Sequence, residues 1–371
     1  MEKLPNQITE IWVNRHNLAQ TKTLAIAFDA KQLQTDEVLL QVDSFGLSAN
    51  NITYALFGEK MAYWGFFPAA EGWDIVPVWG FATVVASKHA EVKVGERVFG
   101  YLPMASHLVM QAGKNTSHGF YDIHAKRKSI SPVYDYYQRT AVDPGYRADK
   151  EAWQLNFRPL FLTSFVLDDY VGETLQQMGA QGTSLGQIVL TSASSKTAYG
   201  AAHLLMKHRA ERGLDYQVVG LTSPSNVAFT KQLGCYDEVL AYPDTTQLSA
   251  NSGTWVLDFS GNKTLLLHLQ QSLQAKLLLI GSTDVDAQHD KPEGQLHSEF
   301  FFAPSQVKKR SAEWGQEGFA LRYAKAWQGF NQLIEQHISE ASYTGADAIE
   351  AMYKTALAGE LNIAQINTLK F

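Results

Sequence analysis

Cysteine is almost absent from this sequence: Cys235 is the only one in 371 residues. A single thiol cannot form an intramolecular disulfide, and it excludes a zinc cluster built from several cysteines of one chain. Long hydrophobic runs are also absent, because no stretch approaches the roughly 20 apolar residues that a membrane-spanning helix needs. The net charge is only −6, which argues against a nucleic-acid partner bound through phosphate contacts.

The first ten residues, MEKLPNQITE, lack both the apolar core of a signal peptide and an arginine-rich transit pattern. Together with the single cysteine, this predicts a cytoplasmic protein. A length of 371 residues and a hydrophobic content of 45% predict an ordinary globular chain of about two or three domains.

The first part of the chain is rich in expected strands. Short apolar segments bounded by turn residues predict a small β-barrel-like domain over residues 1–155. A short helix over residues 49–57 carries Asn50, Asn51 and Tyr54. Residues 112–155 are polar, aromatic and basic, and predict an insertion without a core of its own. The expected strands are residues 8–13, 24–28, 36–46 and 79–87, and residues 92–101 are expected to form a turn followed by a strand.

The pattern changes after residue 156. Strands and helices alternate over residues 188–280, which predicts a parallel sheet with helices on both faces. Two further helices, residues 318–338 and 345–358, precede a closing strand near residues 363–369. The chain is therefore predicted to be an α/β protein with a barrel domain and a doubly wound sheet.

Residues 186–200, GQIVLTSASSKTAYG, predict a strand, a turn of small residues and the start of a helix. Such a turn is a ready anion site, because the first N–H groups of a helix have no partner within it. The glycines expected in a dinucleotide-binding turn are missing. Hydroxyl groups and one lysine stand in their place, and they are the candidate phosphate ligands: Ser192, Ser194, Ser195, Lys196 and Thr197.

Two other interpretations of this turn stay open. It is an ordinary strand-to-helix turn if a serine only caps the helix. It is a phosphate loop of the GxxxxGK[ST] type if Lys196 and Thr197 form its end, although Leu190 and Ser195 would then occupy the two glycine positions.

The next strand favours NADP over NAD. NAD-binding folds place an acidic residue at its end to bind the ribose hydroxyl, but no acid lies between Asp215 and Asp237. Thr222, Ser223 and Asn226 are therefore candidate ligands of a 2′-phosphate, unless they only cap the following helix.

Six segments form a pattern through their order along the chain. They are EVLLQV (37–42) with Gly46 and Asn50 or Asn51, PAAEGW (68–73), VGERV (94–98), LGCYDEV (233–239) with Tyr242, WVLDFSG (255–261) and LLIG (278–281). Taken in this order, they resemble the medium-chain dehydrogenase/reductase superfamily, near its zinc-free quinone oxidoreductase branch. Within it, FYDIH at 120–124 and FFFAP at 300–304, with Arg310, Trp314 and Gly315, resemble a subfamily of unknown function.

The resemblance implies a GroES-like domain over residues 1–155, rejoined by residues 300–371, and a Rossmann NADP-binding domain over residues 156–299. It places Ser192, Ser195 and Ala198 at the family's glycine positions. It adds Tyr242, Gly281 and Ser282 to the expected cofactor contacts, the last two near the nicotinamide.

Zinc-free members reduce quinones, enones or ketones by hydride transfer from a nicotinamide, and the protein then donates a hydrogen bond or proton to the substrate oxygen. By resemblance, Tyr54 is the first candidate donor, although a tyrosine that only packs its ring is an equal alternative. Asn51 accompanies it, with Asn50 an equal candidate. His107, which follows a barrel strand, is a further candidate.

The resulting hypothesis is an NADP(H)-dependent, zinc-independent reductase of a small carbonyl, enone or quinone, with no metal and an expected homodimer. The alternative is an NADPH-binding sensor or structural protein without catalysis, which the missing glycines and the lack of a clear acid–base pair keep open.

Overall fold

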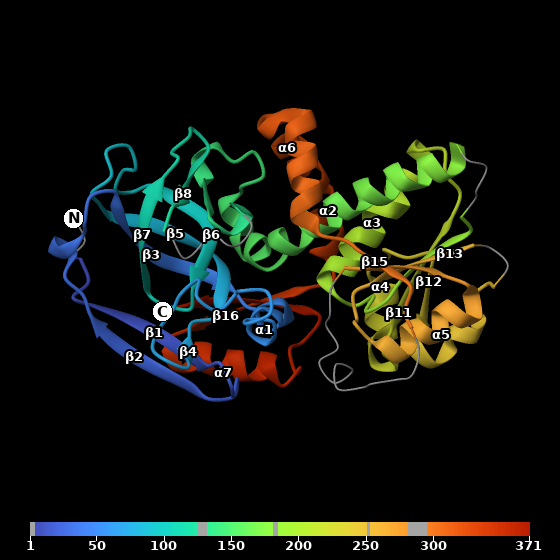
Figure 1. The fold of residues 1–371 in the computed structure, drawn as a ribbon, viewed down its shortest axis with the longest axis horizontal. Helices are drawn as coiled ribbons and strands as arrows, with labels where there is room; N and C mark the ends of the chain where they lie inside the picture. The colour runs from blue at the N-terminus through green and yellow to red at the C-terminus, as the bar shows by residue number, and fades with distance from the viewer. Residues whose placement is uncertain (1–3, 125–131, 181–184, 251–252, 281–294) are drawn as a thin grey trace. The chain divides into compact units, whose positions relative to one another are not determined.

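A computed structural model describes residues 4–124, 132–180, 185–250, 253–280 and 295–371 (Figure 1). The chain divides into two compact units. The first unit contains Met1–Asn156 and Ser339–Phe371, and the second contains Phe157–Ile338. The chain thus returns to the first unit at Ser339, later than the residue 300 expected from the sequence.

The first unit is built on a closed barrel. Strand β3 (Glu37–Gly46) pairs with β5 on one side and with β7 on the other, which closes the ring β3–β5–β6–β9–β8–β7. Strand β17 (Gln365–Lys370) also pairs with β3 and, in parallel, with β16 (Ser339–Thr344). The other barrel strands are β5 (Pro77–Ser87), β6 (Arg97–Pro103), β7 (His107–Gly113), β8 (Gly119–Asp122) and β9 (Tyr136–Arg139).

A small antiparallel sheet and two helices complete the first unit. The sheet has the order β2–β1–β4, and the α1 helix contacts α7. Ser48 caps α1. The elements are β1 (Gln7–Asn14), β2 (Thr21–Ala27), β4 (Trp73–Asp74), α1 (Ala49–Leu56) and α7 (Ala346–Leu357).

Residues 112–155 do not form the expected insertion, because β8 and β9 belong to the barrel. The rings of Phe120 and Tyr137 stack with centroids 6.0 Å apart, and both side chains are fully buried. These strands have only four residues each, GFYD and YYQR, and their polar residues conceal the alternation that identifies a longer strand.

The second unit contains a six-stranded parallel sheet in the order β12–β11–β10–β13–β14–β15. This is the 3-2-1-4-5-6 order of doubly wound dinucleotide-binding folds. The order reverses between β10 and β13, so the carboxyl end of β10 is where a ligand is expected. The strands are β10 (Gln187–Leu190), β11 (Gln217–Thr222), β12 (Glu238–Ala241), β13 (Thr254–Asp258), β14 (Lys276–Leu279) and β15 (Ser298–Phe300).

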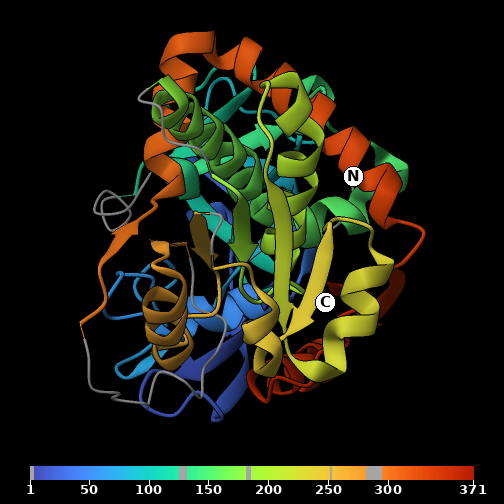
Figure 2. The same ribbon diagram turned by 90° about the vertical axis from the view of Figure 1, so that its right-hand side faces the viewer.

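Helices connect these strands, and Figure 2 shows the sheet among them. Helix α5 (Lys263–Leu273) packs on the face of the sheet that presents Val189, Val219 and Val256. Right-handed crossovers on either side of the β10–β13 reversal place α3 (Lys196–Glu211) on the opposite face. Helix α4 (Val227–Gln232) links β11 to β12.

Two long helices explain where the units divide. Helix α2 (Glu151–Ala180) continues across the unit boundary after Asn156, and α6 (Ala303–Ile334) is interrupted at Gly315, where φ is 73°. Phe161 of α2 stacks on Phe330 of α6 with centroids 4.6 Å apart, so α6 packs within the second unit. No helix in the described part of the chain is long and apolar enough to cross a membrane.

Candidate functional site

The turn after β10 forms without glycine at a position where glycine is usually needed. Ser192 has φ 49°, in the left-handed region that glycine adopts at least cost. Ser195 has φ −77° and caps α3, its Oγ accepting from the N–H of Ala198 at 3.4 Å. Ala198 is buried within α3. Of the three expected glycine positions, Ser192 is therefore the one with a backbone reason for glycine.

Hydrogen bonds gather predicted residues from two strands at this turn. The Ser194 Oγ accepts from the Thr222 hydroxyl at 3.2 Å and from the Asn226 Nδ2 at 3.1 Å. The N–H of Ser192 donates to the Tyr242 hydroxyl at 3.1 Å. Ser223 pairs instead with Ser225 on the surface, at 3.2 Å. The carboxyl end of the sheet is thus a polar surface without a carboxylate between Thr222 and Asn226.

Lys196 lies in the first turn of α3 and is half-buried. Its Nζ is 5.5 Å from the ring centroid of Phe157. No acidic side chain pairs with it in the part of the chain that the structure describes. Desolvation lowers the pKa of Lys196 to about 8. The side chain therefore holds a poorly solvated cation without a counterion.

Backbone groups beside Lys196 also lack partners. The N–H groups of Lys196 and Thr197 have no acceptor among the described residues, as expected for the first turn of a helix. Two amides and an ammonium group at one helix N-terminus, all without partners in the described ranges, form a site for an anion. Gly281 and Ser282, the expected nicotinamide contacts, lie outside the described residues.

Three supports of the turn were not predicted from the sequence. The Tyr236 hydroxyl donates to the carbonyl of Ala193 at 2.8 Å, and the Ser164 hydroxyl donates to the carbonyl of Thr197 at 2.7 Å. The buried hydroxyl of Thr191 donates to Asp258 at 2.5 Å. Each partner comes from a distant part of the sequence, so no local pattern indicates it.

Tyr54, the expected proton donor, lies on α1 in the first unit and is 6% exposed. Its hydroxyl accepts hydrogen bonds from the Asn50 Nδ2 at 2.7 Å and the Trp79 Nε1 at 3.1 Å. Burial raises the pKa of Tyr54 above its usual value, so the phenol is neutral and protonated. Trp79 was not among the predicted site residues, because nothing in the sequence around it indicates that a residue of β5 contacts Tyr54.

Asn51 has a different environment from Asn50. Its Oδ1 accepts from the N–H of Ser48 at 2.8 Å, and its Nδ2 donates to the carbonyl of Pro77 at 3.0 Å. Both ends of the amide therefore hold the start of α1 to β5. Asn50, one residue earlier, is the asparagine in contact with Tyr54.

His107 lies on the other face of its strand from the residues that surround Tyr54. It pairs in register with Gln41, whereas Leu108 pairs with Leu40. Leu40 and Leu108 belong to the apolar cluster that includes Tyr54, and successive side chains point to opposite faces. The Nδ1 of His107 lies 3.0 Å from the Ser106 hydroxyl, and burial lowers the pKa of His107. The structure does not bring His107 together with Tyr54.

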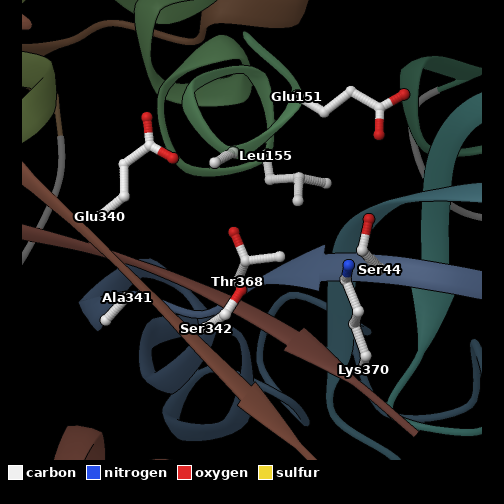
Figure 3. Close-up of a pocket in the computed structure, with 9 residues that line it drawn as sticks. Ser44, Glu151, Leu155, Glu340, Ala341, Ser342, Thr368 and Lys370 are labelled. Atoms are coloured by element: carbon white, nitrogen blue, oxygen red, sulfur yellow. The ribbon is translucent and has the colours of Figure 1, made fainter. Parts of the chain in front are cut away.

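A separate pocket of about 260 Å³ occurs in the first unit, beneath the start of α2 (Figure 3). Its charged side chains include Glu151, Glu340 and Lys370. Glu151 already pairs with Arg97 at 2.8 Å, and Glu340 accepts from the Trp153 indole. The pocket contains none of the predicted site residues. In the described part of the chain, no group of three or more His, Cys, Asp or Glu side chains is placed to bind a metal.

The closed barrel and the parallel sheet in 3-2-1-4-5-6 order together define the fold of the medium-chain reductases. Solved structures share it across the whole chain. CurA from Vibrio vulnificus in complex with NADPH has a TM-score of 0.61 at 13% identity, covering 98% of each chain. The mitochondrial 2-enoyl thioester reductase Etr1p/Etr2p heterodimer from Candida tropicalis has a TM-score of 0.58 at 12% identity, covering 98% of this chain and 100% of that one. The YhdH oxidoreductase from Salmonella enterica in complex with NADP has a TM-score of 0.53 at 15% identity, covering 98% and 99%.

The family itself follows from the sequence comparison. A family model described as "Protein of unknown function (DUF2855)" matches residues 45–362, so the chain belongs to that family. No curated protein matches the chain. The fold predicted by resemblance, a GroES-like barrel with a Rossmann domain, is confirmed.

Proposed function

We propose that this chain binds NADPH and reduces a small carbonyl compound, enone or quinone by hydride transfer without a metal. The observation that carries the proposal is the Lys196 ammonium beside two amides at the N-terminus of α3, none of which has a partner among the described residues. These groups lie at the carboxyl end of β10, where doubly wound folds bind the cofactor pyrophosphate.

The residues present fit this cofactor. Lys196 and the amide of Thr197 would hold pyrophosphate oxygens, with the Ser195 hydroxyl at the same helix end. Thr222, Ser223, Asn226 and Tyr242 would surround the adenosine ribose. Because this segment has no carboxylate, nothing there repels a 2′-phosphate, which favours NADPH over NADH.

In the first unit, Tyr54 is the proposed proton donor. When bound, the cofactor supplies a hydride to the substrate. Negative charge then develops on the substrate oxygen, and a donor at that oxygen stabilises it. A tyrosine phenol is protonated at neutral pH, and burial raises the pKa of Tyr54 further, so it is in the state that donation requires.

An NADPH-binding sensor without catalysis is the second candidate function. The burial of Tyr54 favours it, since a ring packed against Tyr63 and Tyr101 also explains why a tyrosine stands there. NADPH binding is common to both functions, and turnover separates them.

A homodimer is also proposed, through the edge of the parallel sheet. Strand β15 is the last strand of the sheet and carries Phe300, which is 66% exposed. An exposed edge strand with an aromatic side chain favours pairing with another chain. Light scattering measures the molar mass of Phe300→Lys and of the unaltered chain in solution. A dimeric unaltered chain with a monomeric variant supports the dimer through β15. A monomeric unaltered chain contradicts it.

Calorimetric titration tests the cofactor. We expect NADPH to bind more tightly than NADH. Lys196→Ala should weaken NADPH binding by about ten- to a hundredfold, the equivalent of one charge-assisted hydrogen bond. The matched control is Lys207→Ala, which removes an exposed lysine from the same helix and should leave the affinity unchanged. If neither NADPH nor NADH binds, both the reductase and the NADPH-binding sensor are rejected.

Turnover is tested by following NADPH oxidation with carbonyls, enones and quinones. Oxidation that Tyr54→Phe reduces by at least tenfold supports the reductase. Tight NADPH binding with no oxidation across such a panel favours the sensor.

A further inference from the structure

The Tyr54 hydroxyl is held by two donors from different elements. Asn50, one helical turn earlier on α1, donates from Nδ2 at 2.7 Å, and Trp79 on β5 donates from Nε1 at 3.1 Å. An indole N–H can only donate. A hydroxyl oxygen has two acceptor positions, so these two bonds occupy both. The hydrogen of Tyr54 must then point in a third direction.

No protein group in the described part of the chain accepts that hydrogen. The neighbouring rings of Tyr63 and Tyr101 have centroids 4.8 and 5.4 Å from that of Tyr54. The Tyr63 hydroxyl is engaged with that of Tyr134, at 3.2 Å. Tyr54 is therefore surrounded by aromatic rings and has one unused donor. The half-buried Asn50 and Trp79 place this hydroxyl near the surface of the aromatic cluster.

We propose that Asn50 and Trp79 are positioning residues that keep Tyr54 oriented as a donor toward a substrate oxygen. This inference rests on the proposed reductase function. It deepens that function by restricting the substrate to a compound whose reacting oxygen is a hydrogen-bond acceptor, a carbonyl or quinone oxygen.

The two donors also stabilise the product of proton transfer. As the substrate carbon gains a hydride, its oxygen gains an electron pair, and the O–H bond of Tyr54 breaks to form an O–H bond on the substrate. The phenolate left behind still accepts from Asn50 and Trp79, and charge-assisted hydrogen bonds are the stronger ones. The phenolate of Tyr54 then takes up a proton from the solvent, so each cycle consumes one hydride and one solvent proton and is balanced.

Asn50→Asp keeps the shape of the side chain but replaces the Nδ2 donor to Tyr54 with an acceptor oxygen. The carboxylate would accept the Tyr54 hydrogen and divert it from the substrate. A carboxylate in the first turn of α1 is favourable for the helix, so the variant should fold. The matched control is Ala49→Asp, which adds the same charge at the exposed neighbouring position and leaves Asn50 in place.

The expected result is a loss of kcat by at least a hundredfold in Asn50→Asp, with KM and NADPH affinity within threefold of the unaltered chain. Ala49→Asp should retain its kcat within threefold. Trp79→Phe keeps an aromatic ring and removes one donor, and we expect kcat to fall by about tenfold with unchanged KM. A residue that only supports the fold would not produce this split between kcat and KM.

A binding measurement gives a readout that does not need turnover. 4-Nitrophenolate carries an oxyanion on an aromatic ring, and its absorbance reports on hydrogen bonding. We expect the unaltered chain and Ala49→Asp to bind it about tenfold more tightly than Tyr54→Phe and Asn50→Asp do. Equal binding by Asn50→Asp and Ala49→Asp, or by Tyr54→Phe and the unaltered chain, would overturn the inference.

The outcomes separate this inference from the proposed function. If Tyr54→Phe abolishes turnover while Asn50→Asp and Trp79→Phe leave it unchanged, the reductase stands and the positioning role is wrong. If no substrate is reduced but 4-nitrophenolate binding follows the expected order, the donor geometry stands and the reductase is wrong.

Discussion

The hydroxyl of Thr191, at the end of β10, donates to the Asp258 carboxylate at the end of β13, 2.5 Å away. The same Thr191 oxygen accepts from the N–H groups of Phe259 and Ser260, at 3.0 and 3.2 Å. These bonds tie together the carboxyl ends of the two strands between which the sheet order reverses. The buried Thr191 hydroxyl thus holds the ends of β10 and β13 together beside the candidate cofactor site.

Thr191→Val preserves the shape of this side chain and removes its hydroxyl. It removes one hydrogen bond to the buried Asp258 carboxylate, which still accepts from Ser260 and Gly261, and it takes one acceptor from the N–H groups of Phe259 and Ser260. We therefore expect the free energy of unfolding to fall by about 1.5–3 kcal/mol. Chemical denaturation measures it. Thr246→Val, at an exposed position, is the control and should change stability by less than about 0.5 kcal/mol. An equal effect of the two substitutions would contradict this role.

Substitutions of Ser192 measure the backbone strain at this position, where a glycine is expected. With φ at 49°, a residue other than glycine is strained by about 1 kcal/mol. Ser192→Gly and Ser192→Ala both remove the hydroxyl, so their difference isolates the backbone. We expect the glycine variant to be more stable than the alanine variant by about 1 kcal/mol in thermal or chemical unfolding. Equal stability would show that the left-handed conformation is not maintained.

The buried charge of Lys196 should lower the free energy of unfolding when no cofactor is bound. Because desolvation lowers its pKa to about 8, the unfolded chain holds this proton more tightly than the folded chain. Lys196→Met should therefore raise the free energy of unfolding below pH 8, by about 1–3 kcal/mol. The difference between the two proteins should shrink as the pH rises from 8 toward 10, where the unfolded lysine also loses its proton. A gain that does not change with pH would contradict the buried charge.

We predict that the folded protein loses stability in acid when the Asp168 carboxylate becomes protonated. Its burial would raise its pKa, but hydrogen bonds from His208 at 2.8 Å and from Arg212 at 2.7 and 2.8 Å outweigh this and hold the pKa below 3.8. The stabilisation is therefore present above the unfolded pKa and is lost as the pH falls through the lower, folded one.

Removal of one partner from this buried pair leaves an uncompensated charge, so Asp168→Asn should cost about 3–5 kcal/mol at pH 7. Urea unfolding between pH 7 and 3 measures it. The difference from the unaltered chain should be constant above about pH 5 and smaller below pH 4. Asp149→Asn, at an exposed ion pair with Arg147, is the control and should cost less than about 1 kcal/mol.

Secondary structure can be predicted from the sequence wherever apolar periodicity is long. The sequence located β3 and the alternating strands and helices of the second unit, and the order of weak motifs identified the fold. It failed at β8, β9 and the first half of α6, because four-residue polar strands and a glycine-interrupted helix have no clear period. The return at Ser339 depends on the packing of α6 on α2, which no local pattern indicates.

For the candidate site, the sequence determined which chemical groups follow β10 and β11, because residue type alone shows hydroxyls, one lysine and no acid. How each group is used depends on the tertiary structure. It gives Ser192 the left-handed backbone and leaves Lys196 without a counterion among the described residues. It also uses both ends of the Asn51 amide in the fold and places Asn50 and Trp79 on Tyr54. The physical reason is that hydrogen-bond partners and desolvation come from residues far away in the chain, which meet only when the strands are assembled.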